Sequence, residues 1–222
     1  MNEQDIIEKN KSYSFEKAIN FIKNNKTRKF KETIETSIHL NVTPKKKNIS
    51  IKGYSILPND IEKNYNIGVF VTKDETITYN DTNITILNED NIKEFNKKNL
   101  YFDIMITNPK SMIKIGKFSK LLNSKKIMPD IKYGTITNDI SDTITKCKKN
   151  YIKFKNDKND IINCIIGKID LESKKLKENI ETLINDIKKQ KPKNCKNISI
   201  KKISISSTMG PGIKINVNSL II

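Results

Sequence analysis

The chain has 222 residues, and its 42 Lys and Arg against 25 Asp and Glu give a formal net charge of +17 at pH 7. This length permits one ordinary domain or two small ones, and the charge favours a polyanionic partner, with nucleic acid ahead of an anionic membrane surface. No apolar run approaches the roughly 20 residues of a membrane span, and the widely spaced cysteines give no support to a zinc knuckle or a disulfide framework.

The positive charge is carried almost wholly by lysine, because Arg28 is the one arginine in the chain. Together with abundant Ile and Asn, this bias is typical of an A+T-rich genome, so charge alone leaves nucleic-acid binding undecided. Lysine offers a point charge where arginine offers a planar fork, so recognition should depend on backbone and shape. The unpaired cysteines and the polar N-terminal segment predict a reduced, intracellular compartment and no cleaved targeting peptide.

The N-terminal part predicts one helix and two strands. Residues 14–25 place apolar side chains on one helical face, and Ser14 can cap this helix. Residues 29–42 then alternate with a period of two, as a half-buried strand requires. The core-facing residues of this strand are Phe30, Ile34, Ile38 and Leu40. After a loop at Pro44, residues 49–57 are predicted to form its hairpin partner.

A different pattern begins at residue 66. Residues 66–71 form a continuous apolar run, which is typical of a strand buried on both faces of a parallel sheet. The elements predicted next are strands at 83–87 and 101–106, a helix at 88–99, and helices around Met112 and Leu121. This alternation predicts a small α/β layered unit that ends near Asn150.

The C-terminal part returns to the first pattern. Strands are predicted at residues 151–155 and 161–169, and residues 171–190 predict a helix with one apolar stripe, which Pro192 ends. Residues 197–217 predict two alternating strands around a Gly-Pro-Gly turn.

The order of these patterns predicts the domain organisation. Residues 1-66 and 151-222 are expected to form one discontinuous α+β domain, with residues 67-150 inserted as an α/β domain. The two chain crossings near Asn66 and Asn150 are expected to act as a hinge.

Several short motifs are specific enough to compare with known families. SSTMGPGIKINV at residues 206–217 is accompanied by KFKET at 29–33 and KIMPDIKYGTIT at 126–137. Three shorter blocks stand in matching order: IIGK at 165–168, LKENI at 176–180 and QKP at 190–192. Together the blocks resemble, over nearly the whole chain, the bacterial type of the large-subunit ribosomal protein one family, the protein of the mobile stalk beside the tRNA exit site.

The resemblance implies a fold and a binding surface. The implied fold class is an α+β discontinuous two-layer domain with an inserted, mobile Rossmann-like α/β domain. The implied rRNA-binding residues, carried over one by one from the matching motifs, are Lys29, Phe30, Thr33, Gly167, Lys168, Ser206, Thr208, Met209 and Gly210. The resemblance implies no catalytic residue, metal or cofactor, and a protein that is not an enzyme.

The resemblance also implies a role in translation. The chain would be a structural constituent of the large ribosomal subunit, would bind the stalk junction of 23S-type rRNA, and would assist release of deacylated tRNA from the exit site. Family members also repress translation of their own mRNA through a mimic of that junction. The implied location is cytoplasmic and ribosome-associated, in a bacterium or a bacterium-derived compartment. The implied protein makes no membrane contact and is a monomer when free.

The hydroxyl and glycine residues fit RNA chemistry. RNA presents phosphates, 2′-hydroxyls and a wide, shallow minor groove, which hydroxyl groups and exposed backbone can meet. Ser206 and Thr208 can both donate and accept hydrogen bonds there. Gly210 and Gly212 lack side chains and allow close backbone approach, while Pro211 fixes the bend between them before RNA binds.

Charge and apolar surface complete the expected interface. Lys29, Lys31 and Lys168 would attract phosphate, whereas Asp170 would repel it. Phe30 is open to two interpretations, a core position on its strand or an exposed flat face for RNA. The Gly-Lys pair lacks the rest of a nucleotide-binding P-loop, so nucleotide binding is not expected there.

Two other functions remain as alternatives. A generic RNA-binding or RNA-chaperone module outside the ribosome would discriminate poorly between the junction and random duplex. An enzyme that used the α/β insert would need converging acid, base or nucleophilic residues, and none is visible. The sequence departs from the family motifs at Asn163 and Asp170, so the RNA contacts that the family makes at these two positions are not expected here. It also lacks the family's glycines in segments 59–62 and 123–126, on the side thought to approach tRNA, which makes tRNA contact less secure than rRNA contact.

Overall fold

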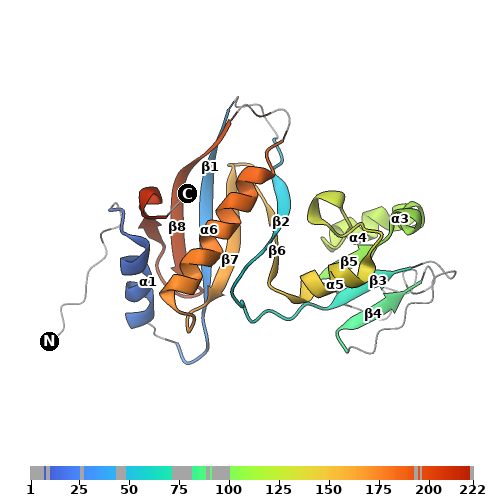
Figure 1. The fold of residues 1–222 in the computed structure, drawn as a ribbon, viewed down its shortest axis with the longest axis horizontal. Coiled ribbons are helices and arrows are strands. Elements are labelled where there is room, and N and C mark those ends of the chain that lie inside the picture. Colours follow the sequence, from blue (N-terminus) through green and yellow to red (C-terminus); the bar gives the residue numbers. More distant parts are fainter. Residues whose placement is uncertain are drawn as a thin grey trace. The chain divides into compact units, whose positions relative to one another are not determined.

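The computed structural model describes residue 8 and residues 11–25, 28–43, 49–71, 82–88, 91, 101–192, 195 and 197–220. The chain is a mixed α/β protein with two compact units (Figure 1). Unit 1 comprises Met1–Glu62 and Asn150–Ile222, and unit 2 comprises Lys63–Lys149. The chain therefore leaves unit 1 once and returns to it once.

Unit 1 contains a four-stranded antiparallel sheet in the order β7-β1-β8-β9. Its strands are β1 (Thr33–Thr43), β7 (Ile161–Lys168), β8 (Asn197–Ser207) and β9 (Ile213–Ile215). The predicted hairpin between β1 and the segment 49–57 is wrong. β2 (Lys52–Ile56) pairs instead with β6 (Tyr151–Lys155) in a separate two-stranded sheet, because β7 and β8 occupy both edges of β1.

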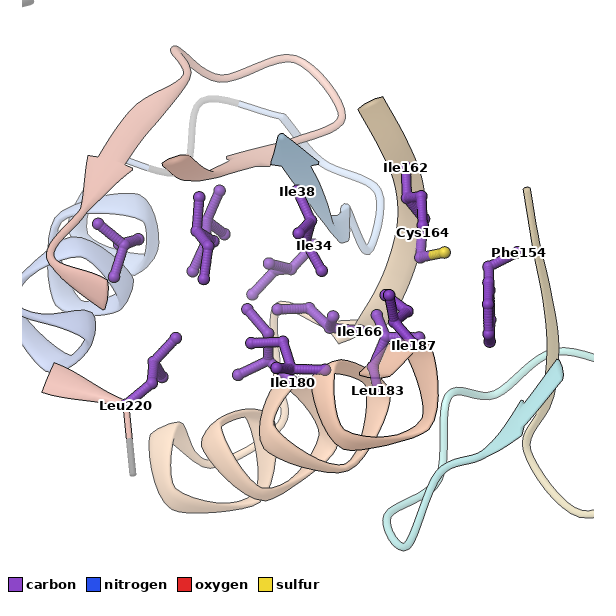
Figure 2. Packing of buried hydrophobic residues seen from close by; sticks show 14 of the residues in the cluster. Ile34, Ile38, Phe154, Ile162, Cys164, Ile166, Ile180, Leu183, Ile187 and Leu220 are labelled. Atoms are coloured by element: carbon purple, nitrogen blue, oxygen red, sulfur yellow. The ribbon is translucent and has the colours of Figure 1, made fainter. Parts of the chain in front are cut away.

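Two helices cover one face of this sheet and create the core of unit 1. They are α1 (Phe15–Asn24) and α6 (Ser173–Lys189). Figure 2 shows isoleucines of β1 and β7 directed toward the apolar stripe of α6, and the labelled residues include Ile34, Ile38, Ile162, Ile166, Ile180, Leu183 and Ile187. The predicted stripe of the long helix and the alternation of the strands are thus confirmed. Residues of opposite parity on β1, such as Glu35, lie on the face without helices.

The start of α1 differs in one detail from the prediction. Ser14 occupies the N-cap position with an extended backbone, but its side chain makes no capping hydrogen bond. The backbone N–H of Phe15 donates instead to the hydroxyl of Ser219, from a 3₁₀ turn η3 (Val217–Ser219) near the other end of the chain. A partner distant in sequence therefore satisfies the first of the N–H groups that the start of the helix leaves without a helical partner.

Two asparagines fasten the chain crossings to unit 1. Asn150 has a left-handed backbone (φ 49°), and its backbone and side-chain oxygens accept hydrogen bonds from Leu57 N (3.1 Å) and Ile61 N (3.3 Å). Asn179 of α6 is fully buried, and it accepts from Asn59 N (2.9 Å) and donates to Ile166 O (2.8 Å). The outgoing and returning segments are therefore held side by side at the edge of unit 1.

Unit 2 contains a parallel three-stranded sheet in the order β4-β3-β5. Its strands are β3 (Ile67–Phe70), β4 (Ile84–Leu87) and β5 (Ile104–Thr107), and all residues of β3 and β5 are buried, as predicted for β3. The helices that the structure describes over their whole length in this unit are α3 (Pro109–Ile115), α4 (Ser119–Ser124) and α5 (Ile140–Lys148), with 3₁₀ turns η1 (Gly116–Phe118) and η2 (Ile131–Tyr133).

The helices of unit 2 match the sequence analysis in part. The helices around Met112 and Leu121 are confirmed as α3 and α4, whereas the helix predicted at 88–99 falls largely outside the described residues. Helix α5 was not predicted, although Asp139 caps it through a hydrogen bond from Asp142 N. Nowhere in the described part of the chain does a helix combine the length and apolar composition of a bilayer crossing.

Candidate nucleic-acid interface

Three segments distant in sequence meet at one end of the unit 1 sheet. Thr33, the first residue of β1, lies opposite Lys168, the last residue of β7. The next residue, Ile34, lies between Gly167 of β7 and Ser207 of β8. Since the predicted RNA-binding residues all lie within or beside these strand ends, the fold gathers them into one region. This region, hereafter the binding end, contains Lys29, Phe30, Thr33, Gly167, Lys168, Ser206, Thr208, Met209 and Gly210.

A cluster of hydrogen bonds around Thr33 joins the three segments. The hydroxyl of Thr208 accepts from Thr33 N (3.0 Å) and donates to Thr33 O (3.3 Å). The ammonium of Lys168 donates to the hydroxyl of Thr33 (2.9 Å). The one hydroxyl proton of Thr208 is therefore used within the protein, and an RNA group can reach this oxygen only as a donor.

Ser206 provides a hydroxyl of a different kind. It lies opposite Glu35 of β1, half-buried on the sheet face that the helices leave open. Among the described residues, no side chain or backbone group forms a hydrogen bond with its hydroxyl. Ser206 can therefore both donate to and accept from a ligand without breaking a protein hydrogen bond.

Two large apolar side chains of the binding end face solvent. Phe30 is 51% exposed and Met209 is 57% exposed. The predicted core-facing position of Phe30 is wrong, because β1 begins only at Thr33 and Phe30 lies in a bend before the strand alternation starts. The alternative interpretation, an exposed aromatic face, is confirmed.

The loop after β8 is held by its own backbone and by a buried carboxylate. Gly210 N donates to Ser207 O (3.2 Å), and Met209 N donates to Oε2 of Glu32 (3.1 Å). A Cβ atom on Gly210 would press against the hydroxyl of Ser207, whereas a Cβ on Gly212 would meet open space. A side chain at the first position would therefore require the Ser207 hydroxyl to rotate away, and one at the second position would require no change in the protein.

Gly167 meets a steric requirement on the inner side of the sheet. It is buried with φ of +157°, and a Cβ there would lie 2.8 Å from Leu176 Cδ2 and 3.1 Å from Leu171 Cδ2. The pairing of β1 with β7 also shifts register between Ile34 and Glu35, next to this glycine. Gly167 therefore allows the sheet to approach α6. It also determines the position of the next residue, Lys168, at the end of β7.

The lysines of the binding end are not electrostatically equivalent. Lys31 pairs with the carboxylates of Glu62 (3.6 Å) and Asp170 (3.7 Å), which offsets its charge and that of Asp170. Lys29 is exposed, and Lys168 uses one of its three donors on Thr33. The attraction for phosphate expected of Lys31 is therefore reduced, and so is the repulsion expected of Asp170.

Sequence reasoning missed Glu32, which is only 2% exposed. An acidic residue on the same strand parity as Ile34 and Ile38 was the available signal, because a charged side chain on the buried parity needs a specific partner. The cysteines are a separate matter. Cys147, Cys164 and Cys195 are buried and form no disulfide bond, and the described residues contain no group of His, Cys, Asp and Glu that could hold a metal ion.

The comparisons agree with the motifs. The sequence profile of the ribosomal protein L1p/L10e family matches residues 22–211. The large ribosomal subunit protein uL1 of Coxiella burnetii is 35% identical over 211 residues, which cover 95% of this chain and 91% of that protein. The protein of the same name from Pseudoalteromonas atlantica is 34% identical over 218 residues, covering 98% and 94%, respectively.

A third relative, the large ribosomal subunit protein uL1 of Chromohalobacter salexigens, is 32% identical over 214 residues and aligns with 96% of this chain and 93% of its own length. Proteins of this family are structural RNA-binding proteins, and the chain is accordingly not an enzyme. The motif at residues 206–217, the strand ends that it meets and the match over most of the sequence together establish that the chain belongs to the ribosomal protein L1p/L10e family.

Proposed function

We propose that the chain is a structural constituent of the large ribosomal subunit and binds the stalk junction of 23S-type rRNA at the binding end of unit 1. The observation that carries this proposal is the gathering of the three motif segments at one sheet end, where Phe30 and Met209 are exposed and Ser206 has an unused hydroxyl. The relatives' name, large ribosomal subunit protein uL1, supports the same partner.

The groups at the binding end suit a folded RNA surface. Ser206 can exchange hydrogen bonds with 2′-hydroxyls, and Thr208 can accept one, which suits the minor groove of an RNA helix. Phe30 and Met209 offer apolar surface for an unstacked base or a ribose. Lys29 and Lys168 add phosphate attraction, so binding should weaken as salt is raised.

The rRNA proposal is tested by comparing two RNAs at one salt concentration. Fluorescence anisotropy with a labelled stalk-junction RNA and a random duplex of equal length should give affinities that differ by about a thousandfold or more in favour of the junction. Equal affinities would instead support the alternative of a generic RNA-binding or RNA-chaperone module. Sedimentation with large subunits on a sucrose gradient would place the protein on the ribosome.

We further propose that unit 2 is a mobile, Rossmann-like insert that assists release of deacylated tRNA from the exit site. Its parallel β4-β3-β5 sheet with α3, α4 and α5 supports the Rossmann-like description. The rRNA site would then belong to unit 1 alone. Because Ile61 N and the Asn150 side chain are hydrogen-bonded at 3.3 Å, a short glycine linker can replace residues 63–149. The shortened protein should retain most of its junction affinity, and loss of binding in a folded deletion variant would refute the assignment.

The remaining parts of the proposal concern regulation and location. Binding to a mimic of the junction in its own mRNA would repress translation, since the same groups at the binding end would contact both RNAs. The protein would be a monomer when free and ribosome-associated in the cytoplasm of a bacterium or in a bacterium-derived compartment. Translation of a reporter that carries the chain's own leader, with and without added protein, tests the repression.

A further inference from the structure

The binding end contains a buried negative charge among exposed residues. The neighbours Lys29, Phe30 and Lys31 are all exposed, yet Glu32 is only 2% exposed. Burial of a carboxylate is unfavourable unless hydrogen bonds satisfy it. A surface that receives phosphates gains nothing electrostatically from a carboxylate, so the position of Glu32 calls for a geometric explanation.

Glu32 contacts both of the other segments that form the binding end. Its backbone oxygen accepts from Ile169 N (3.0 Å), the first residue after β7, and its side-chain oxygen accepts from Met209 N (3.1 Å), the second residue after β8. In the described part of the chain, no lysine or arginine forms an ion pair with its carboxylate. The carboxylate thus serves as a hydrogen-bond acceptor for the loop.

The hydrogen bond to Met209 N completes the internal bonding of that loop. Gly210 N is already bonded to Ser207 O, and the hydroxyl of Thr208 is bonded to Thr33. With Met209 N also bonded, the conformation of Thr208–Gly210 is fixed before any ligand arrives. RNA would therefore meet the exposed Met209 side chain and the remaining acceptor site of Thr208 in a preset arrangement.

We propose that Glu32 is a positioning residue that presets the Thr208–Gly210 loop for RNA, acting through the Met209 amide and not through its charge. This inference rests on the proposed rRNA function. A loop that is ordered in the free protein does not lose conformational entropy when RNA binds, so the hydrogen bond raises affinity without touching RNA.

Three substitutions separate geometry from charge. Glu32→Gln keeps an oxygen that can accept from Met209 N and removes the charge, so its junction affinity should stay within about threefold of the parent protein. Glu32→Asp keeps the charge but is one methylene shorter, and Glu32→Ala removes the acceptor. Both should weaken junction binding by about tenfold or more.

Two further readouts exclude a general loss of structure. Amide hydrogen exchange at Met209 should become faster in Glu32→Asp and Glu32→Ala and remain slow in Glu32→Gln. The slope of affinity against salt should be the same in all variants, because Glu32 contacts no phosphate. Ile34→Val serves as the matched control, since it weakens the same strand in the core and leaves the loop bonds intact.

The outcomes distinguish this inference from the rRNA proposal. If the parent protein fails to discriminate the junction from random duplex, the proposed function fails. If the parent discriminates but Glu32→Asp and Glu32→Ala bind as well as it does, only the role of Glu32 fails. The role of Glu32 would also be overturned if Glu32→Ala bound the junction more tightly than Glu32→Gln does. The same holds if the control Ile34→Val lost as much junction affinity as Glu32→Ala.

Discussion

Ser206 and Thr208 offer the sharpest test of the binding end, because one hydroxyl is unused by the protein and the other is shared with Thr33. Removing the Ser206 hydroxyl in Ser206→Ala breaks no protein hydrogen bond, so the free energy of unfolding should change by less than about 0.5 kcal/mol. The same substitution removes one hydrogen bond to RNA and should weaken junction binding by about 0.5–1.5 kcal/mol, or about two- to twelvefold.

Thr208→Val removes a hydroxyl at nearly constant shape and should change both quantities. Two hydrogen bonds to the backbone of Thr33 are lost, at 3.0 and 3.3 Å. Because this site is exposed and water can replace part of the lost bonding, the free energy of unfolding should fall by about 1 kcal/mol, below the roughly 2 kcal/mol expected of two buried bonds. Junction affinity should fall as well, since the loop is both less well held and short of one acceptor.

Urea denaturation followed by circular dichroism gives the stability of each variant, and anisotropy titration at fixed salt gives the affinity. Ser206→Ala should lower the junction affinity alone, whereas Thr208→Val should lower both the junction affinity and the free energy of unfolding. If the free energy of unfolding of Ser206→Ala fell by more than about 1 kcal/mol, the Ser206 hydroxyl could not be unbonded within the protein. Unchanged junction affinity in both variants would exclude this sheet end as the RNA site.

Other positions give independent tests. Gly210→Val should weaken junction binding by about 1 kcal/mol or more, because its side chain displaces the Ser207 hydroxyl and blocks backbone approach. Gly212→Ala should leave the free energy of unfolding in urea unchanged within about 0.5 kcal/mol, because a Cβ there meets open space in the protein. Asn179→Leu should lower the free energy of unfolding by about 3 kcal/mol in urea, because Asn59 N and Ile166 O lose their partner in a buried site, and a loss below about 1 kcal/mol would contradict the buried network. Burial raises the pKa of the Cys164 thiol from 9.0 to about 12, so Cys164 in the native protein should resist alkylation at pH 8, as mass spectrometry of the labelled protein would show. The same shift means that folding favours the neutral thiol, so its contribution to stability is complete below pH 9 and is lost as the pH rises toward 12, which urea titrations across that range would measure.

Local patterns predicted the strands and the long helix well, because β1 and α6 each place their apolar residues at the spacing of one buried face. Ile34 and Ile38 on β1 and Ile180 and Leu183 on α6 are all fully buried. The motif residues could be assigned to an RNA surface by resemblance, and the fold brings their three segments to one sheet end. That their side chains contact RNA stays a prediction.

Features that depend on distant partners were not predictable from local patterns. The pairing of β2 with β6 follows from β7 and β8 occupying both edges of β1, which no local pattern records. Phe30 shares the parity of a strand that begins three residues later, so alternation placed it in the core. The N–H of Phe15 is bonded to Ser219, a residue 204 positions away, whereas the predicted cap Ser14 makes no capping hydrogen bond.

The interrupted course of unit 1 has a consequence for biosynthesis. Strand β1 is made early, but its partner β8 follows only after the whole insert, and Thr33 and Thr208 are 175 residues apart. A chain growing from its N-terminus can therefore complete unit 2 while β1 still lacks a neighbour on either edge. If folding of unit 2 brings Ile61 and Asn150 together, which are 89 positions apart, the 175-residue loop between Thr33 and Thr208 is shortened to about half, and the entropic cost of closing it falls by about 0.6 kcal/mol. The nascent chain would thus complete this end of the sheet last, after translation has passed Gly210.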